Sequence, residues 1–213
     1  MIKVLNRIYQ KCCRLFFWHT YKTVFRALGR GAYIVRPFRI DGRNDIAIGE
    51  NTFFQRGAWL YCGGVNNRQA SLSVGDGCVF GYNNHITAVG NVVIGNHVLT
   101  ANNVYISDNT HSYEDIGTPI INQPVQFKGA VEIGDGCWIG ENACIIGARV
   151  GKNSVIGANA VVTSDIPDYA VAVGIPAQII RRFDTNLNRW VPLKRLRPQV
   201  PGSSNETRVA EQT

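Results

Sequence analysis

A large aliphatic or similar residue recurs at every sixth position along much of this chain, and glycine often follows it directly. These repeat anchors form five runs of three: Ile48, Phe54 and Leu60; Val74, Phe80 and Ile86; Ile94, Thr100 and Ile106; Ile133, Ile139 and Ile145; and Val150, Ile156 and Val162. A period of six is too long for the alternation of a flat strand, and it matches no helical stripe, which repeats near 3.6 residues. It predicts short strands separated by tight turns, with the anchors in the core.

Three such units are expected to close one three-sided coil, so that anchors stack on anchors at a spacing of about 4.8 Å between coils. Asn and Gly at the turns, as in Glu50-Asn51 and Asn102-Asn103, tolerate the positive φ that a tight turn demands. The small residue four positions after an anchor is also expected to point inward. Cys78 and Cys137 occupy this position and are therefore predicted to be core residues.

The regular spacing breaks only after the third unit of a run. The next anchor follows after 14 residues from Leu60, 8 from Ile86, 27 from Ile106 and 5 from Ile145. If each run is a full coil, the three insertions leave from one corner of the prism and gather along one edge. Loops on a rigid scaffold commonly carry binding and chemistry. The longest insertion, roughly residues 112–131, directly follows His111, so this edge is the expected site.

Composition and charge fit one globular domain. The 213 residues are 45% hydrophobic and 17% charged, with a net charge of +7, and no apolar stretch approaches the roughly 20 residues of a membrane span. Residues 1–31 hold seven basic residues and no acidic one, whereas residues 32–180 are net acidic and residues 181–213 are again net basic. Because the body of the chain is acidic, we expect no nucleic-acid partner.

The six cysteines are expected to be free thiols, because the chain lacks a secretory signal pattern and Cys12 directly precedes Cys13. No Cys-x-x-Cys or paired Cys/His spacing indicates zinc, so no metal is expected. A cytoplasmic protein is therefore predicted.

Several motifs follow the repeat in a fixed order: Ile106-Ser-Asp-Asn-Thr-His111, Cys137-Trp-Ile-Gly140, the run 155–163 with Asp165-Ile-Pro167, and Gly174-Ile-Pro-Ala-Gln-Ile-Ile-Arg181. Through them, over about residues 45–182, the chain resembles the hexapeptide-repeat O-acetyltransferases, which include galactoside, maltose and nodulation-factor acetyltransferases. The segment 183–193, with Trp190, looks most like the lipopolysaccharide and exopolysaccharide branch.

The resemblance implies an all-β fold, a left-handed parallel β-helix over residues 32–182, and a homotrimer. The handedness comes from the family alone, since parallel crossovers are generally right-handed. Residues 1–31 are expected to form a basic amphipathic helical segment, and residues 183–213 a C-terminal extension that is disordered after about residue 198. The implied activity is transfer of an acetyl group from acetyl-CoA to a sugar hydroxyl at a cleft between neighbouring chains.

The resemblance also implies roles for individual residues. His111 matches the family's catalytic histidine and would accept the hydroxyl proton, a role worth ~10²–10⁴ in rate. Asn84 matches a catalytic asparagine at the acceptor and acyl site, which we expect to meet His111 of the neighbouring subunit, and His85 is the reserve candidate there. Asp108, Glu114 and Asp115 are all near enough in sequence to orient the imidazole, and Asp108 is also a candidate substrate-binding residue.

For the donor, Gly140, Ala158 and Thr163 match positions along which the pantetheine arm lies in the family. Arg181 matches a phosphate contact. Ser164 is also a cofactor-binding candidate, although relatives often have Lys at this position, and Lys152 is an alternative source of charge for the phosphates.

The N-terminal segment has two interpretations that are compatible with each other. Residues 3–28 read as a helix whose basic and aromatic side chains suit an anionic membrane surface, as a peripheral contact. The same helix would also cap the open end of a solenoid.

The acceptor predicted from the resemblance is a sugar of a bacterial surface polysaccharide, of its lipid-linked precursor or of lipopolysaccharide. Alternatives are a small acceptor such as a free sugar or xenobiotic alcohol, an acyl carrier protein as donor, a γ-type carbonic anhydrase, and a β-solenoid scaffold without catalysis.

Overall fold

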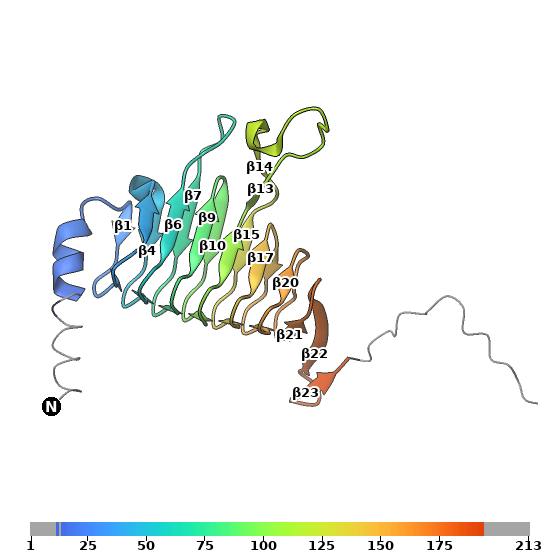
Figure 1. The fold of residues 1–213 in the computed structure, drawn as a ribbon. Coiled ribbons are helices and arrows are strands. Elements are labelled where there is room, and N and C mark those ends of the chain that lie inside the picture. The colour runs from blue at the N-terminus through green and yellow to red at the C-terminus, as the bar shows by residue number, and fades with distance from the viewer. Residues whose placement is uncertain (1–11, 13, 194–213) are drawn as a thin grey trace, which may run out of the picture.

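The computed structural model describes Cys12 and residues 14–193, which form an elongated three-sided prism with a short helix at its N-terminal end (Figure 1). Its three walls are sheets of short parallel strands. Sheet A contains β1 (Ala27–Leu28), β4 (Ile46–Ile48), β7 (Ser71–Val74), β10 (Asn91–Ile94), β15 (Val131–Ile133) and β18 (Arg149–Val150). Sheet C contains β3 (Arg39–Asp41), β6 (Trp59–Cys62), β9 (His85–Ala88), β12 (Tyr105–Ser107), β17 (Cys144–Ile146) and β20 (Val161–Val162).

Sheet B forms the third wall and also carries the C-terminal strands. It contains β2 (Tyr33–Ile34), β5 (Phe53–Phe54), β8 (Val79–Phe80), β11 (Leu99–Thr100), β16 (Trp138–Ile139), β19 (Val155–Ile156), β21 (Ala170–Val173), β22 (Gln178–Asp184) and β23 (Arg189–Pro192). The chain visits A, B and C in turn, so one turn of the prism is one coil. Outside the walls lie the hairpin of β13 (Asn109–His111) and β14 (Val125–Phe127) and two 3₁₀ turns, η1 (Arg43–Asp45) and η2 (Ile120–Asn122).

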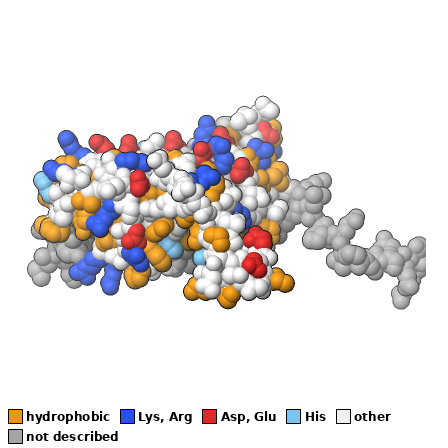
Figure 2. Space-filling view, turned by 90° about the horizontal axis from the view of Figure 1, so that it is seen from above, with side chains coloured by type: hydrophobic (Ala, Val, Ile, Leu, Met, Phe, Trp, Pro, Cys, Tyr) orange, Lys and Arg blue, Asp and Glu red, His pale blue; other side chains and the backbone are white. Residues whose placement is uncertain are grey.

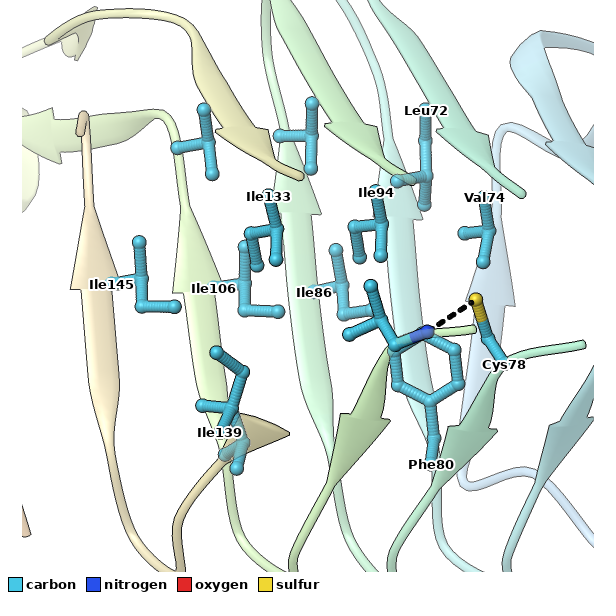
Figure 3. Close-up of a cluster of buried hydrophobic side chains, with 14 of the residues drawn as sticks. Leu72, Val74, Cys78, Phe80, Ile86, Ile94, Ile106, Ile133, Ile139 and Ile145 are labelled. Atoms are coloured by element: carbon cyan, nitrogen blue, oxygen red, sulfur yellow. Dashed lines mark hydrogen bonds between the residues drawn. The ribbon is translucent and has the colours of Figure 1, made fainter. Parts of the chain in front are cut away.

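The repeat anchors occupy the interior, as predicted. Every anchor is buried, and Val74 is the most exposed of them at 4%. The parallel registers pair anchor with anchor, for example Ile48 with Val74 in sheet A and Ile86 with Ile106 in sheet C. Figure 3 shows part of this stack, in which Ile86, Ile106 and Ile145 follow one another from coil to coil. The rings of Phe54 and Phe80 also stack, with 4.0 Å between their centroids. The core is thus a continuous stack, which confirms a parallel β-helix.

The two predicted cysteine positions also lie in this core. Cys78 and Cys137 are buried, and the Sγ of Cys137 lies 3.0 Å from the carbonyl oxygen of Gly151. The backbone N–H of Val98 donates to the Sγ of Cys78 at 3.4 Å, the dashed line in Figure 3. The five described cysteines, Cys12, Cys62, Cys78, Cys137 and Cys144, are free thiols.

The first coil begins earlier than the sequence analysis placed it. Leu28 and Ile34 lie in register with Ile48 and Phe54, so a further coil precedes the five runs and includes residues before the expected boundary at 32. The expected helix over 3–28 is wrong at its end, because the last helical residue is Tyr21 and strand β1 covers Ala27–Leu28. The aromatic and basic residues continue past Tyr21 in a pattern typical of an amphipathic helix, which explains the error. The residues after Tyr21 form a turn and then strand β1.

Both ends of the described prism are covered. At the N-terminal end Phe17 and Phe25 are buried against the core, with Tyr21 packed beside them. At the C-terminal end β22 pairs antiparallel with β21 and β23 pairs antiparallel with β22, while Ala177 and Ile179 pack against the core. The expected boundary at 182/183 therefore falls inside β22. The expected disorder after about residue 198 lies outside the described residues.

Asparagines line the corner between sheets B and C. Asn83, Asn103, Asn142 and Asn159 all have positive φ, between 55° and 59°. Their side-chain amides form a chain of hydrogen bonds from coil to coil, such as Asn103 Nδ2 to Asn142 Oδ1 at 3.1 Å. Asn tolerates this backbone region better than most residues, which explains why it recurs at this corner.

All three insertions leave at the corner where the chain passes from sheet C to sheet A, as predicted. We call this the insertion corner. It lies along the upper edge in Figure 1, where the loop between β6 and β7 and the β13–β14 hairpin with its long loop project from the same side of the prism.

Candidate functional site

The insertions touch one another at their bases. The guanidinium of Arg68, in the first insertion, lies over the ring of Phe127 in β14, with 4.1 Å from Cζ to the ring centroid. Phe127 also packs on Gly90 in the second insertion, where an added Cβ would lie 2.5 Å from the ring. The absence of a side chain at Gly90 therefore allows Phe127 to dock, and the three insertions form one unit.

His111 is the last residue of β13 and belongs to this unit. It pairs with Val125 across the hairpin, and its side chain is exposed. Among the residues that the structure describes, its imidazole has no hydrogen-bond partner, which leaves both ring nitrogens available to a ligand. The hydroxyl of the neighbouring Ser112 is buried and likewise lacks a partner within the described chain.

Asp108 has a different task from either of those expected. It is fully buried, and its two carboxylate oxygens accept the backbone N–H groups of Val89 at 2.9 Å and Gly90 at 2.7 Å. The side chain of Asn109 donates to the same carboxylate at 3.1 Å. Asp108 therefore fixes the base of the hairpin to the second insertion, which does not fit direct contact with substrate or with the imidazole of His111.

Glu114 and Asp115, the other two carboxylates proposed to orient the imidazole, accept hydrogen bonds within their own loop. Glu114 accepts the backbone N–H of Tyr113 at 3.0 Å, and Asp115 accepts that of Gly117 at 2.9 Å. A hydrogen bond from the side chain of Thr118 is the main cause of a lowered pKa at Asp115, with the backbone N–H of Gly117 second. Neither carboxylate bonds to His111.

Asn84 faces the interior of its coil. It is fully buried, and its Nδ2 donates to the carbonyl oxygens of Gly81 at 2.8 Å and Ala101 at 3.0 Å. Its Oδ1 accepts the hydroxyl of Thr100 at 3.0 Å. With these groups engaged, the side chain closes a corner between coils. Its expected roles at an acceptor and towards His111 of a neighbouring chain stay predictions.

Asn84 and His111 also lie far apart along the wall. Asn84 precedes β9 at the corner between sheets B and C, whereas His111 follows β12 at the insertion corner. Since β9 and β12 are adjacent parallel strands, the two residues are separated by about the length of a strand.

His85, the next residue, points outward instead. Its ring stacks on Trp59 at 4.0 Å with 3° between the planes, and Tyr105 lies on its other side at 5.1 Å. Its Nε2 is 3.0 Å from the Thr87 hydroxyl, and burial lowers its pKa. The sequence analysis missed this aromatic column. The signal was present, because Trp59, His85 and Tyr105 each stand one position before the third anchor of a run.

The residues matched to a donor site lie at the C-terminal end of the prism but do not form one cluster. Gly140 and Ala158 are neighbours in successive coils at the corner between sheets B and C. Thr163 and Ser164 are exposed at the insertion corner, beyond the opposite end of β20, and Arg181 is exposed on β22. Lys152 lies near Asp168, with 3.9 Å between Nζ and Oδ2. The sheet C strands β17 and β20 lie between the pair Gly140 and Ala158 at one corner and the pair Thr163 and Ser164 at the other.

Within the described part of the chain, no group of three His, Cys, Asp or Glu side chains comes together in the way a metal ion requires.

Comparison with known proteins assigns the chain to a family. Residues 130–164 match the repeat family described as hexapeptide repeat of succinyl-transferase. The putative lipopolysaccharide biosynthesis O-acetyl transferase WbbJ of Escherichia coli is 31% identical over 180 residues, which cover 78% of this chain and 86% of WbbJ. The chain belongs to the hexapeptide-repeat O-acetyltransferase family. The match to WbbJ is much longer than the 130–164 segment that the repeat model covers, so the family assignment does not depend on that segment alone.

Two further known proteins are similar to parts of this chain. The probable acetyltransferase Rv3034c of Mycobacterium tuberculosis is 39% identical over 129 residues, or 59% of this chain, and the chain spans 43% of that relative's length. Among solved structures, the N-acyltransferase AntD of Bacillus cereus superposes with a TM-score of 0.65 at 16% identity, covering 79% of this chain and 89% of AntD. The last likeness shows the shared fold.

Proposed function

We propose that this chain transfers an acetyl group from acetyl-CoA to a sugar hydroxyl, with His111 as the general base. The observation that carries the proposal is the exposed imidazole of His111, unpartnered in its own described chain, on the edge where all three insertions meet. A hydroxyl is barely acidic at neutral pH, and a neutral imidazole is the side chain suited to accept its proton.

The chemistry needs one base and no metal. As the sugar oxygen attacks the thioester carbonyl, its proton passes to His111. The C–S bond then breaks and the departing sulfur takes the proton back as CoA thiol. The hydrogen bonds that the backbone of the second insertion donates to Asp108 would hold the hairpin, and so the imidazole, in place during these steps.

Support for the donor comes from relatives. A hexapeptide-repeat acetyltransferase of Vibrio cholerae was solved in complex with acetyl coenzyme A, and AntD with 3-hydroxybutyryl-CoA. We propose that the pantetheine arm follows the prism between Gly140 and Ala158 on one side and Thr163 and Ser164 on the other. The phosphates would then be met by Arg181.

The acceptor class follows from WbbJ, whose name refers to lipopolysaccharide biosynthesis. We propose a sugar of a surface polysaccharide, of its lipid-linked precursor or of lipopolysaccharide, modified on the cytoplasmic side of the membrane. We further propose the left-handed sense and the homotrimer that the family implies. A neighbouring subunit would complete the surroundings of His111, whose own chain supplies no partner among the described residues.

The test is a transfer assay with labelled acetyl-CoA and deacetylated surface glycans, comparing His111→Asn with His97→Asn. His97 is a matched control, because it is an exposed histidine at another corner with φ of 55°, a backbone region that Asn tolerates. We expect His111→Asn to lose ~10²–10⁴ of kcat and His97→Asn to keep wild-type activity. A His111→Asn variant with wild-type kcat would refute the assigned base, and no transfer to any glycan or small alcohol would refute the proposed enzyme.

A further inference from the structure

The described part of the N-terminal helix, Cys12 and residues 14–21, has one side that packs on the prism. Phe17 is 6% exposed, and its ring lies 4.7 Å from that of Tyr21 and 6.2 Å from that of Phe25, measured between centroids. This side covers the open end of the first coil. The capping role is therefore complete without the remaining side chains of the helix.

Two large apolar side chains of the same helix point away from the core. Leu15 is 60% exposed and Phe16 is 72% exposed. Adjacent exposed apolar side chains lose hydrophobic stabilisation in water, and capping does not require them. They are suited to entering an apolar phase.

Basic residues lie at the same end of the chain: Arg14 and Arg30 line one hollow with Leu15, whereas the guanidinium of Arg26 donates to Ser73 Oγ at 2.7 Å. Arg14, Lys22, Arg26 and Arg30 are all exposed, and none of them forms an ion pair with a described acidic residue. Arg14 instead donates to the Asn51 side chain at 3.1 Å, and the ammonium of Lys22 lies 4.8 Å from the ring centroid of Trp18. The sequence of residues 1–31 contains no acidic residue. Figure 2 shows Lys and Arg side chains spread over this end of the molecule, at the left.

We infer that this helix docks the protein on an anionic lipid surface, with Leu15 and Phe16 inserted among the lipids and the basic residues at the headgroups. Apolar insertion combined with cations is the pattern of an interfacial helix, whereas binding to a soluble polyanion needs the cations alone. No helix among the described residues is long and apolar enough to cross a membrane. The inference is independent of the proposed acetyl transfer.

The test is flotation of the full chain with vesicles of phosphatidylcholine alone or mixed with phosphatidylglycerol, at low and at high salt. We expect binding to the anionic vesicles at low salt and little binding to the neutral ones. Leu15→Ser/Phe16→Ser should weaken binding about tenfold or more. Ile120→Ser/Ile121→Ser is the matched control, since it removes an adjacent apolar pair that is 54% and 87% exposed in the longest insertion.

Lys22→Gln/Arg30→Gln tests the charge separately, and it should weaken binding to anionic vesicles while leaving the apolar pair intact. Thermal unfolding at the wild-type temperature would show that each variant is folded. The inference fails if the protein does not float with anionic vesicles, or if neutral vesicles bind equally well. It also fails if Leu15→Ser/Phe16→Ser binds like wild type while soluble polyphosphate competes, because the surface would then recognise polyanions. Loss of acetyl transfer to a soluble acceptor would bear on the proposed enzyme and not on this surface.

Discussion

Arg68 covers the ring of Phe127 at 4.1 Å and thereby joins two insertions that are separated by more than forty residues in the sequence. Phe127 pairs with Asn109 across the hairpin whose other strand ends at His111. The position of the imidazole thus depends on a contact formed outside its own loop.

Phe127→Ala is expected to loosen the hairpin and reduce activity. The substitution removes both the cation–π contact and the packing on Gly90, but leaves His111 in the chain. Because catalysis requires a held geometry, we expect kcat to fall by about tenfold to a hundredfold with a smaller change in the KM for acetyl-CoA. Phe127→Tyr keeps the ring and should restore most of the activity. Equal kcat for Phe127→Ala and wild type would show that the hairpin is held without this contact.

Asn84→Ala is expected to act on stability. The change leaves the carbonyl oxygens of Gly81 and Ala101 without their side-chain donor inside the prism, at a cost of about 1–3 kcal/mol. Urea unfolding measures this cost, and exposed Asn122→Ala is the control. A stable Asn84→Ala protein with a large loss of kcat would restore the catalytic role that the family resemblance suggests.

Gly140→Ala separates coil packing from donor binding. A Cβ at this position would lie 2.6 Å from the backbone nitrogen of Ala158 and 2.8 Å from the carbonyl carbon of Gly157. We expect a loss of about 1–3 kcal/mol in the free energy of unfolding, as for other overpacked sites. Ala158→Ser, at an exposed position of the next coil, should unfold like wild type. If Gly140→Ala keeps its stability but binds acetyl-CoA more weakly, donor contact and not packing requires the glycine.

We expect the half-buried imidazole of His85 to make the protein less stable in mild acid. Burial lowers its pKa, so the folded state favours the neutral ring. The pKa of His85 in the unfolded chain is about 6.5, and above this pH the ring is neutral in both states. As the pH falls below this value the unfolded chain takes up the proton first, so the free energy of unfolding decreases. His85→Phe keeps the stacking on Trp59 and should show a smaller fall in melting temperature between neutral pH and pH values below 6.5. Identical falls in both proteins would contradict this.

The cysteines should differ sharply in reactivity. Burial raises the pKa of the Cys62 and Cys137 thiols to about 11 and also raises that of Cys78. Since the thiolate is the reactive form, these three should resist maleimide at neutral pH until the protein unfolds, whereas exposed Cys12 should react at once. Mass spectrometry of labelled peptides with and without urea measures the difference. Rapid native labelling of Cys137 would mean that the last coils open readily.

The sequence predicted the fold well because the determining signal is local and repeated. Each anchor from Ile48 to Val162 is defined by spacing alone, and the steps between runs located the insertion corner. The first coil was missed because Leu28 and Ile34 follow a basic aromatic segment that resembles a helix. Spacing therefore identified the coils but not the point at which the chain enters them.

The site was less predictable, since side-chain direction alternates with every residue. Asn84 and His85 are neighbours in sequence, yet one closes a corner inside the prism and the other stacks on Trp59 outside it. The bonds of Asp108 to Val89 and Gly90 join segments whose approach depends on the paths of two loops. The six-residue spacing predicts neither the directions of Asn84 and His85 nor the contacts of Asp108.

Because every insertion leaves from one corner, the three walls are built independently of the loops. The anchors pair in register on all three walls, and loop length at the insertion corner enters none of these pairings. The segments 63–70 and 112–124 can therefore change in length without altering the pairing of the walls, whereas the packing of Arg68 on Phe127 ties the sequences of the two loops to each other.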